Sequence, residues 1–300
     1  RIIDKLSIAE APAWLRYRLE ACGIRAINQV VDVTNYVMLE TGQPLHAFDW
    51  DQLPEKSIVV RPARETKQFT TLDGVTRELG HDDLLICAGE TPVALAGIMG
   101  GLETEVRAST STVLLESANF ASSSIRRTAK RLGLHSEASH RFERVVDPEG
   151  TIKALDRAVW LLRALAAGSE ASGAADEYPG RTKPAVLWLR AERIEQLLGV
   201  RIELEHAERL LGVLGLKIER EPKRRSLKVT VPASRPDLTR EADLIEELAR
   251  LDGYDKIPMT LPAFRNSAKR DERLAWERKL RVLLNGEGMT EVINLPFVSE

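Results

Sequence analysis

Hydrophobic residues recur at helical spacing in several segments of the chain. In residues 27–40, Val30, Val33 and Val37 fall on one face, and Gly42 and Pro44 then break the pattern. The sequence therefore predicts a helix there. The same kind of apolar stripe predicts helices over residues 12–23, 123–132, 137–146, 151–167, 205–214, 239–251 and 272–284, and a short helix ending at Gly199. Ser122 is the expected cap of the helix over residues 123–132.

Shorter segments are rich in branched aliphatic side chains and predict β-strands. They cover residues 57–61, 84–87, 93–98, 113–117, 186–190, 216–219, 227–231 and 291–295. Residues 69–79 predict a hairpin, because Asp73-Gly74 is a pair that supplies positive φ in a tight turn. The glycines within residues 97–101 predict close backbone packing at a strand end, since their spacing matches no phosphate-binding loop.

Two changes in composition divide the chain. Residues 166–180 are small, rich in glycine and serine, and end in Pro-Gly, and a second break lies at Pro258 and Pro262. The fold class predicted is α+β, with a mixed α/β domain over residues 1–180 and a small winged-helix-like module over residues 181–258. Residues 259–300 are expected to be a linker and the start of a third domain, so we expect a piece of a longer protein.

Composition limits the functional classes. The net charge is −2, so any RNA contact must come from a local basic patch. Cys22 and Cys87 are the only two cysteines, and the sequence has no C-x-x-C and no His/Cys pair at zinc spacing. Neither a disulfide scaffold nor a structural zinc site is therefore expected, and a reducing cytoplasm fits. No apolar run approaches the ~20 residues of a membrane span, so no membrane partner is expected.

Few residues suggest catalysis by their pattern alone. No serine lies in a G-x-S-x-G elbow and neither cysteine has a nearby histidine, so covalent catalysis has no support. Thr34 and Asn35 border the apolar face of their helix, and His46 follows the break as an expected loop residue. These side chains either address one concave site or serve local turns. Glu116 lies in an apolar strand, so it either faces solvent or has a partner.

Three long motifs resemble the editing domain of bacterial phenylalanyl-tRNA synthetase β subunits. They are VDVTNYVMLETGQPLHAFD (residues 31–49), LLESANF (114–120) and SEASHRFERVVDP (136–148). In that family the domain removes tyrosine wrongly attached to tRNA(Phe). By motif position, the resemblance assigns the editing pocket to His46, Gly100, Glu116, Ser136 and Ala138, with Thr34 and Asn35 beside them. Ser136 stands where relatives often have threonine, which keeps the hydroxyl but changes the pocket shape slightly.

The implied chemistry depends on one hydroxyl group. An apolar pocket rejects an added hydroxyl by only about 10²-fold, so a second site must recognise the tyrosine hydroxyl directly. Glu116 is the expected acceptor for that hydroxyl, and His46 and Asn35 are expected to orient water or the terminal ribose. No residue is assigned as a general base.

The second module carries a group of carboxylates. Asp243, Glu246 and Glu247 have i, i+3 and i+4 spacing, and Asp237 precedes the helix. An exposed acidic face partly offset by Arg250 is one interpretation, and a Mg²⁺ site is the other. The pattern R-x-D, D-L-I-E-E and G-Y-D-x-I-P resembles the module before the catalytic-like domain of the same β subunits. That resemblance assigns Mg²⁺, shared with the α subunit, to these four carboxylates.

The same resemblance implies partners. The parent would be an α2β2 ligase that joins phenylalanine to tRNA(Phe) with ATP, with the synthetic site on the α subunit and no role for DNA. A non-catalytic scaffold that binds tRNA and a free-standing trans-editing hydrolase are the alternatives. Arg126, Arg127, Lys130 and Arg131 lie opposite Ile125 and Ala129, and they form either a solvated face or a contact with tRNA phosphates.

Overall fold

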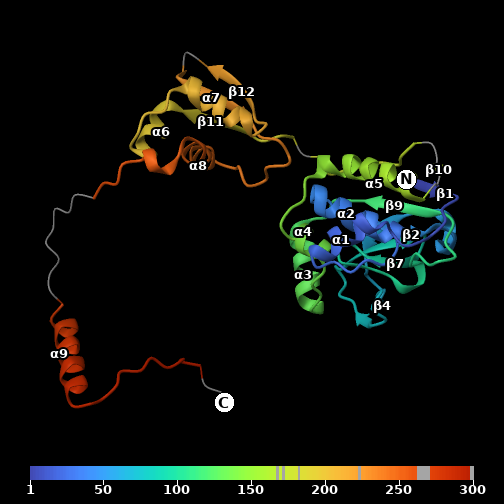
Figure 1. The fold of residues 1–300 in the computed structure, drawn as a ribbon, viewed down its shortest axis with the longest axis horizontal. Coiled ribbons are helices and arrows are strands. Elements are labelled where there is room, and N and C mark those ends of the chain that lie inside the picture. The colour runs from blue at the N-terminus through green and yellow to red at the C-terminus, as the bar shows by residue number, and fades with distance from the viewer. Residues whose placement is uncertain (167–168, 171–172, 182, 222–223, 262–270, 298–300) are drawn as a thin grey trace. The chain divides into compact units, whose positions relative to one another are not determined.

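The structure is a computed structural model that describes residues 1–166, 169–170, 173–181, 183–221, 224–261 and 271–297. The chain divides into two compact units, Arg1–Ile257 and Pro258–Glu300 (Figure 1). Residue 167, the end of one predicted helix, and Pro262, part of the second predicted boundary, lie outside the described residues. In the described part, no helix is long and apolar enough to span a bilayer.

The first sheet is antiparallel and has four strands. Their order is β10 (Ser169–Glu170), β1 (Ile2–Asp4), β9 (Val113–Ser117) and β2 (Leu45–Asp49). Three helices share a core with this sheet: α1 (Ala13–Ala21), α2 (Gln29–Thr41) and α5 (Thr151–Ala166). Val30, Val33 and Val37 are fully buried in that core, so the face predicted for α2 is correct. The prediction of a loop or linker over residues 166–180 was wrong at Ser169–Glu170, which form β10 and pair with β1.

A second antiparallel sheet packs beside the first within the same domain. It contains β3 (Val59–Pro62), β6 (Leu84–Ala88), β7 (Thr91–Leu95) and β8 (Met99–Gly100), and β4 (Gln68–Thr70) and β5 (Thr76–Glu78) form the predicted hairpin. The helices α3 (Ser122–Leu132) and α4 (Glu137–Phe142) supply Ile125, Ala129 and Phe142 to its core.

Strand β2 belongs to both cores. Successive side chains of a strand point to opposite faces. Ala47 accordingly joins the core of α1, α2 and α5, and Phe48 joins the core of the second sheet. Because β2 is the last strand in the order of its sheet, one of its edges has no neighbouring strand there.

Two details of the predicted helices were wrong. The helix α3 begins at Ser122 itself, after Ala121, and no side chain caps it. The helix α4 ends at Phe142 rather than near residue 146, because Val145 has a φ of 70°, which is incompatible with a right-handed helix.

Residues 186–257 form the small α+β arrangement that was predicted. The sheet order is β11-β13-β12, and the elements are β11 (Val186–Arg190), α6 (Ala191–Leu198), α7 (Leu204–Val213), β12 (Lys217–Glu221), β13 (Ser226–Thr230) and α8 (Glu241–Asp252). Leu189, Ile194, Leu211 and Leu244 are fully buried in its core. Each helix presents one apolar face to the three-stranded sheet, as its spacing predicted.

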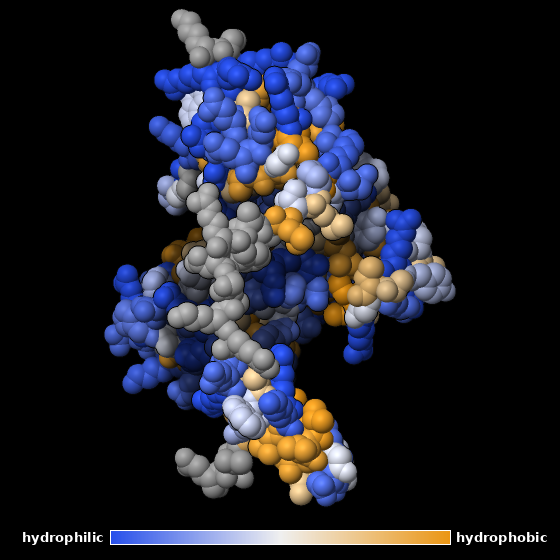
Figure 2. All heavy atoms as spheres, turned by 90° about the vertical axis from the view of Figure 1, so that its left-hand side faces the viewer, coloured by the Kyte–Doolittle hydropathy of each residue, from blue (hydrophilic) through white to orange (hydrophobic). Residues whose placement is uncertain are grey.

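The second unit contains α9 (Glu272–Gly286), whose apolar side chains remain on the surface (Figure 2). The strand predicted over residues 291–295 was wrong. Ile293 is 96% exposed and Leu295 is 81% exposed, so no neighbouring strand or core among the described residues covers them. An alternating apolar pattern alone does not form a strand without a partner.

Candidate functional site

A cavity of about 270 Å³ lies against β2, α2, β8 and the start of α4. Six of the residues that the motifs assign to a pocket line it: Thr34, Asn35, His46, Gly100, Ser136 and Ala138. The rest of its wall is largely apolar and includes Ile27, Val31, Met38, Leu72, Ile98 and Val106. The six assigned residues come from four separate segments of the chain and thus meet around one concave space.

Glu116 is the seventh assigned residue and is not among those that line the cavity. It lies on β9 directly opposite His46 on β2, and residues opposite each other in an antiparallel pair project from the same face. Its Oε2 atom is buried and has no hydrogen-bond partner among the residues that the structure describes. Burial raises the pKa of Glu116 to about 7. This carboxylate is therefore held next to the cavity wall with an unsatisfied acceptor.

His46 lies in strand β2, so its prediction as a loop residue was wrong. The strand forms because residues 45–49 pair with β9, a partner distant in sequence. The imidazole meets Phe48 edge to face, with ring centroids 4.5 Å apart. It makes no hydrogen bond to any described residue, and burial lowers the pKa of His46 to about 4. The ring is consequently neutral near pH 7.

Gly100 allows the backbone to approach this imidazole closely. A Cβ atom at Gly100 would lie 2.7 Å from Cε1 and 2.8 Å from Nε2 of His46, and one at Gly101 would lie 2.6 Å from the Val93 carbonyl oxygen. All three distances are too short to accommodate a Cβ atom. The prediction of close backbone packing is confirmed, and the reason is a direct contact with the pocket histidine.

The two hydroxyl groups of the cavity are engaged in local structure. Thr34 Oγ1 donates to the Val31 carbonyl oxygen at 2.7 Å. Ser136 Oγ donates to the Ile98 carbonyl oxygen at 2.7 Å and accepts from the Ser139 backbone N–H at 3.0 Å, which caps α4. These hydroxyls hold the walls of the cavity together. Their donor hydrogens are not free for a substrate.

Three other polar groups face the cavity. The Asn35 side chain makes no hydrogen bond with the described residues and is only half-buried, so its amide is free to bind. Glu105 and Glu137 also line the wall, and neither was singled out from the sequence. Glu137 lies in one of the quoted motifs, but Glu105 follows a short 3-10 helix and no periodic pattern marks it.

The exposed face of α3 is basic. Arg126, Arg127 and Lys130 are exposed and form no ion pair with a described residue, whereas Arg131 pairs with Asp83. A helix C-terminus favours cations in its last turn, which accounts for Lys130 and Arg131 but not for the two arginines at mid-helix. The segment after α3 leads to Ser136 in the cavity wall, so these cations are close in sequence to the cavity.

Comparison with known sequences identifies this part of the chain. A sequence model described as the B3/4 domain matches residues 1–167, which is more than half of the chain. The chain belongs to the B3/4 domain family. The cavity lies within this B3/4 domain, and a second model, described as the tRNA synthetase B5 domain, matches residues 187–254.

Several curated relatives share the name phenylalanine–tRNA ligase beta subunit. Those from Geobacter sulfurreducens and Moorella thermoacetica are 49% and 48% identical over 302 and 301 residues, covering 100% and 99% of this chain and 37% of each relative. The chain thus spans little more than a third of their length. These similarities confirm the family resemblance of the sequence motifs.

A solved N-terminal fragment of the phenylalanyl-tRNA synthetase beta subunit from Pyrococcus horikoshii is more distant. It is 16% identical and has a TM-score of 0.39, covering 84% of this chain and 70% of that chain. This score is too low to establish a shared fold.

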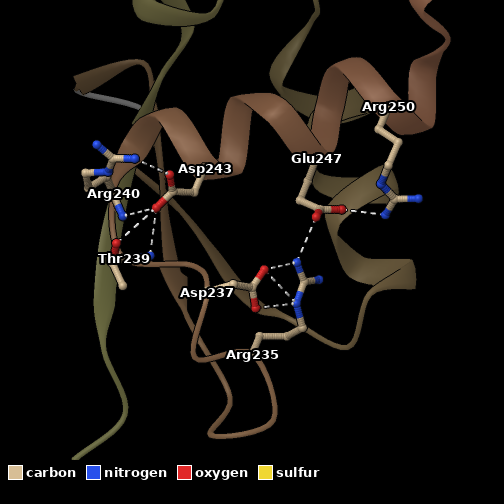
Figure 3. Close-up of polar contacts among 7 residues, drawn as sticks. All are labelled: Arg235, Asp237, Thr239, Arg240, Asp243, Glu247 and Arg250. Atoms are coloured by element: carbon tan, nitrogen blue, oxygen red, sulfur yellow. Dashed lines mark hydrogen bonds and ion pairs between the residues drawn. The ribbon is translucent and has the colours of Figure 1, made fainter. Parts of the chain in front are cut away.

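In the B5 domain, arginines pair with three of the four predicted metal ligands, Asp237, Asp243 and Glu247 (Figure 3). Nη2 of Arg235 donates to Asp237 at 2.6 Å and to Glu247 at 2.7 Å, and Arg250 also pairs with Glu247. Arg235 lowers the pKa of Asp237 through this hydrogen bond. The charge of these carboxylates is therefore already compensated within the chain.

Asp243 and Glu246 differ from each other in their contacts, and Asp243 also forms an ion pair with Arg240 at 3.1 Å. Asp243 accepts from the backbone N–H groups of Thr239 at 2.9 Å and Arg240 at 2.8 Å, which lowers the pKa of Asp243 to about 2 and caps α8 (Figure 3). Glu246 is exposed and has no such contact with the described residues. Within the described ranges, no three His, Cys, Asp or Glu side chains are arranged to hold a metal ion. The carboxylates as placed here do not fit a Mg²⁺ site.

Proposed function

We propose that this chain carries the editing site of a phenylalanine–tRNA ligase β subunit and hydrolyses Tyr-tRNA(Phe). One observation carries the proposal: the six assigned lining residues converge from four segments on a cavity that adjoins a buried carboxylate with no hydrogen-bond partner among the described residues. The B3/4 match and the names of the relatives support it. Because the chain spans about a third of those relatives, their complete activity is part of the proposal.

Glu116 would provide the selectivity. The phenolic hydroxyl of tyrosine donates a hydrogen bond to Oε2, and binding has to uncover this oxygen because it is buried in the unliganded chain. A hydrogen bond to a charged acceptor contributes about 1.5–3 kcal/mol, or roughly 10- to 150-fold. Phenylalanine has no hydroxyl and leaves the carboxylate unpaired. The site therefore spares the correctly charged tRNA.

Hydrolysis itself would depend on positioning. With its pKa near 4, His46 is a weak proton acceptor at neutral pH, so it orients water or ribose through hydrogen bonds. The free amide of Asn35 provides a second contact of the same kind. An aminoacyl ester is reactive, and holding water and ester in one geometry accelerates the reaction without a dedicated base.

The RNA would contact the basic face of α3. Arg126, Arg127 and Lys130 offer three unpaired cations to phosphates, and each phosphate contact increases the salt dependence of binding. An Arg126→Ala/Arg127→Ala variant should bind tRNA(Phe) more weakly and with a shallower salt dependence. Arg25→Ala/Arg163→Ala removes the same charge from exposed positions elsewhere and is the control. Equal slopes for both variants and wild type would exclude this surface.

The remaining features of the parent enzyme are proposed from the family alone. They are an α subunit as partner in an α2β2 assembly, ATP-dependent synthesis of Phe-tRNA on that subunit, Mg²⁺ as cofactor and a cytoplasmic location. The B5 carboxylates, as paired here, support no step that uses Mg²⁺. Formation of a complex on mixing with the α subunit tests the partner and distinguishes a β subunit from a free-standing hydrolase.

Deacylation of Tyr-tRNA(Phe) and Phe-tRNA(Phe) by the 300-residue chain tests the central proposal. Wild type should hydrolyse the tyrosyl ester preferentially, and Glu116→Ala should lose that preference. Glu65→Ala changes an exposed carboxylate of the same domain and should behave as wild type. A wild-type chain that hydrolyses neither ester would favour a scaffold, and an unchanged rate for Glu116→Ala would refute the role of this residue.

A further inference from the structure

The residues around the cavity differ in burial. His46 lines the cavity and lies opposite Glu116, whose Oε2 has no access to solvent. Glu105 also lines the cavity but is exposed and directly follows the 3-10 helix Leu102–Thr104, so the cavity is open to solvent on the side of Glu105. A ligand in the cavity can therefore lie with one end toward the buried carboxylate and the other near the exposed one.

Glu105 differs from the other carboxylate in the cavity wall. Glu137 forms an ion pair with Arg141 at 2.6 Å, so its charge is compensated. Glu105 forms no hydrogen bond and no ion pair with any described residue, although it lies in the wall of a mostly apolar space. Its negative charge is free to attract a cation in the mouth of the cavity.

The chemistry of an aminoacyl ester matches this arrangement. The α-amino group is attached to the carbon next to the ester carbonyl, at the opposite end of the amino acid from the phenol. An α-amino group is partly protonated near neutral pH, and its protonated form carries a positive charge. With the phenol directed toward Glu116, the ammonium group emerges on the open side of the cavity.

We infer that Glu105 binds the α-ammonium group of the mischarged amino acid and so fixes its ester at the mouth of the cavity. This inference rests on the proposed editing function. It adds a second anchor, so that the substrate is held at both ends of the amino acid. Two anchors fix the orientation of the α-carbon and so of the ester carbonyl attached to it, which one anchor at the phenol does not.

A substrate without the amino group tests the inference. The wild-type 300-residue chain should hydrolyse Tyr-tRNA(Phe) about 10- to 100-fold faster, in kcat/KM, than tRNA(Phe) esterified with 3-(4-hydroxyphenyl)propionate. Glu105→Gln should slow hydrolysis of the tyrosyl ester by that factor and leave the deamino ester unchanged. The preference for the amino group then disappears in the variant.

Glu103→Gln is the matched control, because Glu103 is exposed on the same 3-10 helix and does not line the cavity. This variant should keep the wild-type preference. An unchanged preference in Glu105→Gln, or equal losses on both esters, would overturn the inference, since the second result indicates a general structural effect. If wild type hydrolyses neither ester, the editing proposal fails and the inference fails with it.

Discussion

Glu116→Gln should stabilise the B3/4 domain at alkaline pH, because it removes a buried negative charge. The ordinary pKa of a glutamate is 4.5, and burial raises that of Glu116 to about 7. Each unit of pKa difference corresponds to 1.36 kcal/mol, so keeping the ionised carboxylate in the fold costs about 3 kcal/mol. Glutamine has nearly the same shape and carries no charge.

The sign of the effect depends on pH. Below pH 4.5 the carboxyl group is protonated in both the folded and unfolded chain, and Glu116 imposes no electrostatic cost. As the pH rises toward 7, the unfolded chain releases its proton first, and the folded state loses relative stability. The advantage of the variant should therefore grow between pH 4.5 and 7 and be complete above pH 7.

Hydrogen exchange of the β2 and β9 amides measures this stability locally, which is necessary because a chain with several units does not unfold in one step. Wild type and Glu116→Gln should match at pH 4.5 and differ by up to about 3 kcal/mol at pH 8. The His46 titration is common to both proteins and cancels in the difference. A difference that is the same at both pH values would refute burial of the charge as the cause.

Three further substitutions test other contacts of the two domains. Relative to His46→Gln, wild type should lose about 3 kcal/mol of B3/4 stability between pH 6.5 and 4, because burial lowers the pKa of His46 to about 4 and the Glu116 titration is common to both proteins. An equal pH dependence of hydrogen exchange in the two proteins would contradict the assignment. Gly100→Ala should displace the His46 ring and so lower the rate of Tyr-tRNA deacylation more than tenfold, while the circular dichroism spectrum stays unchanged. The control Gly212→Ala, on α7, should leave the rate unchanged. Arg235→Met should lower the thermal stability of the B5 domain by about 1–2 kcal/mol, and Arg193→Met should not; equal melting temperatures would show that the Arg235 contacts contribute little.

Local patterns predicted the elements whose stability is local. The apolar spacing of Val30, Val33 and Val37 located α2 to within two residues, because the same side chains form the buried face. The Asp73-Gly74 turn located the β4–β5 hairpin, since Gly74 has a φ of 75°. In both cases the decisive residues are near one another in sequence.

These local patterns could not predict pairing between segments that are distant in sequence. Strand β2 follows a helix break and carries polar residues, so its sequence resembles a loop until β9 pairs with it. The same pairing brings His46 opposite Glu116, seventy positions away, and no periodicity predicts that register. Only the resemblance to a known family placed the two residues in one site.

The carboxylates of the B5 domain illustrate a further limit. Helical spacing correctly brought Asp243 and Glu247 onto neighbouring positions of α8. The spacing did not predict that backbone N–H groups would donate hydrogen bonds to the Asp243 carboxylate. It also did not predict that Arg235, in the preceding loop, would bind both Asp237 and Glu247. Sequence spacing gives the positions of charges on a helix, whereas their partners depend on the path of the flanking loop.

Strand β2 contributes Ala47 to one core and Phe48 to the other, and His46 between Leu45 and Ala47 lines the cavity. Under the proposed editing function, fidelity and folding therefore depend on the same five residues, Leu45–Asp49. Heat, or a remote substitution that leaves a void in either core, would loosen the packing, shift this strand and enlarge the cavity. Discrimination between the two esters should accordingly decline at temperatures below the melting transition, which makes accuracy the more heat-sensitive property of the domain.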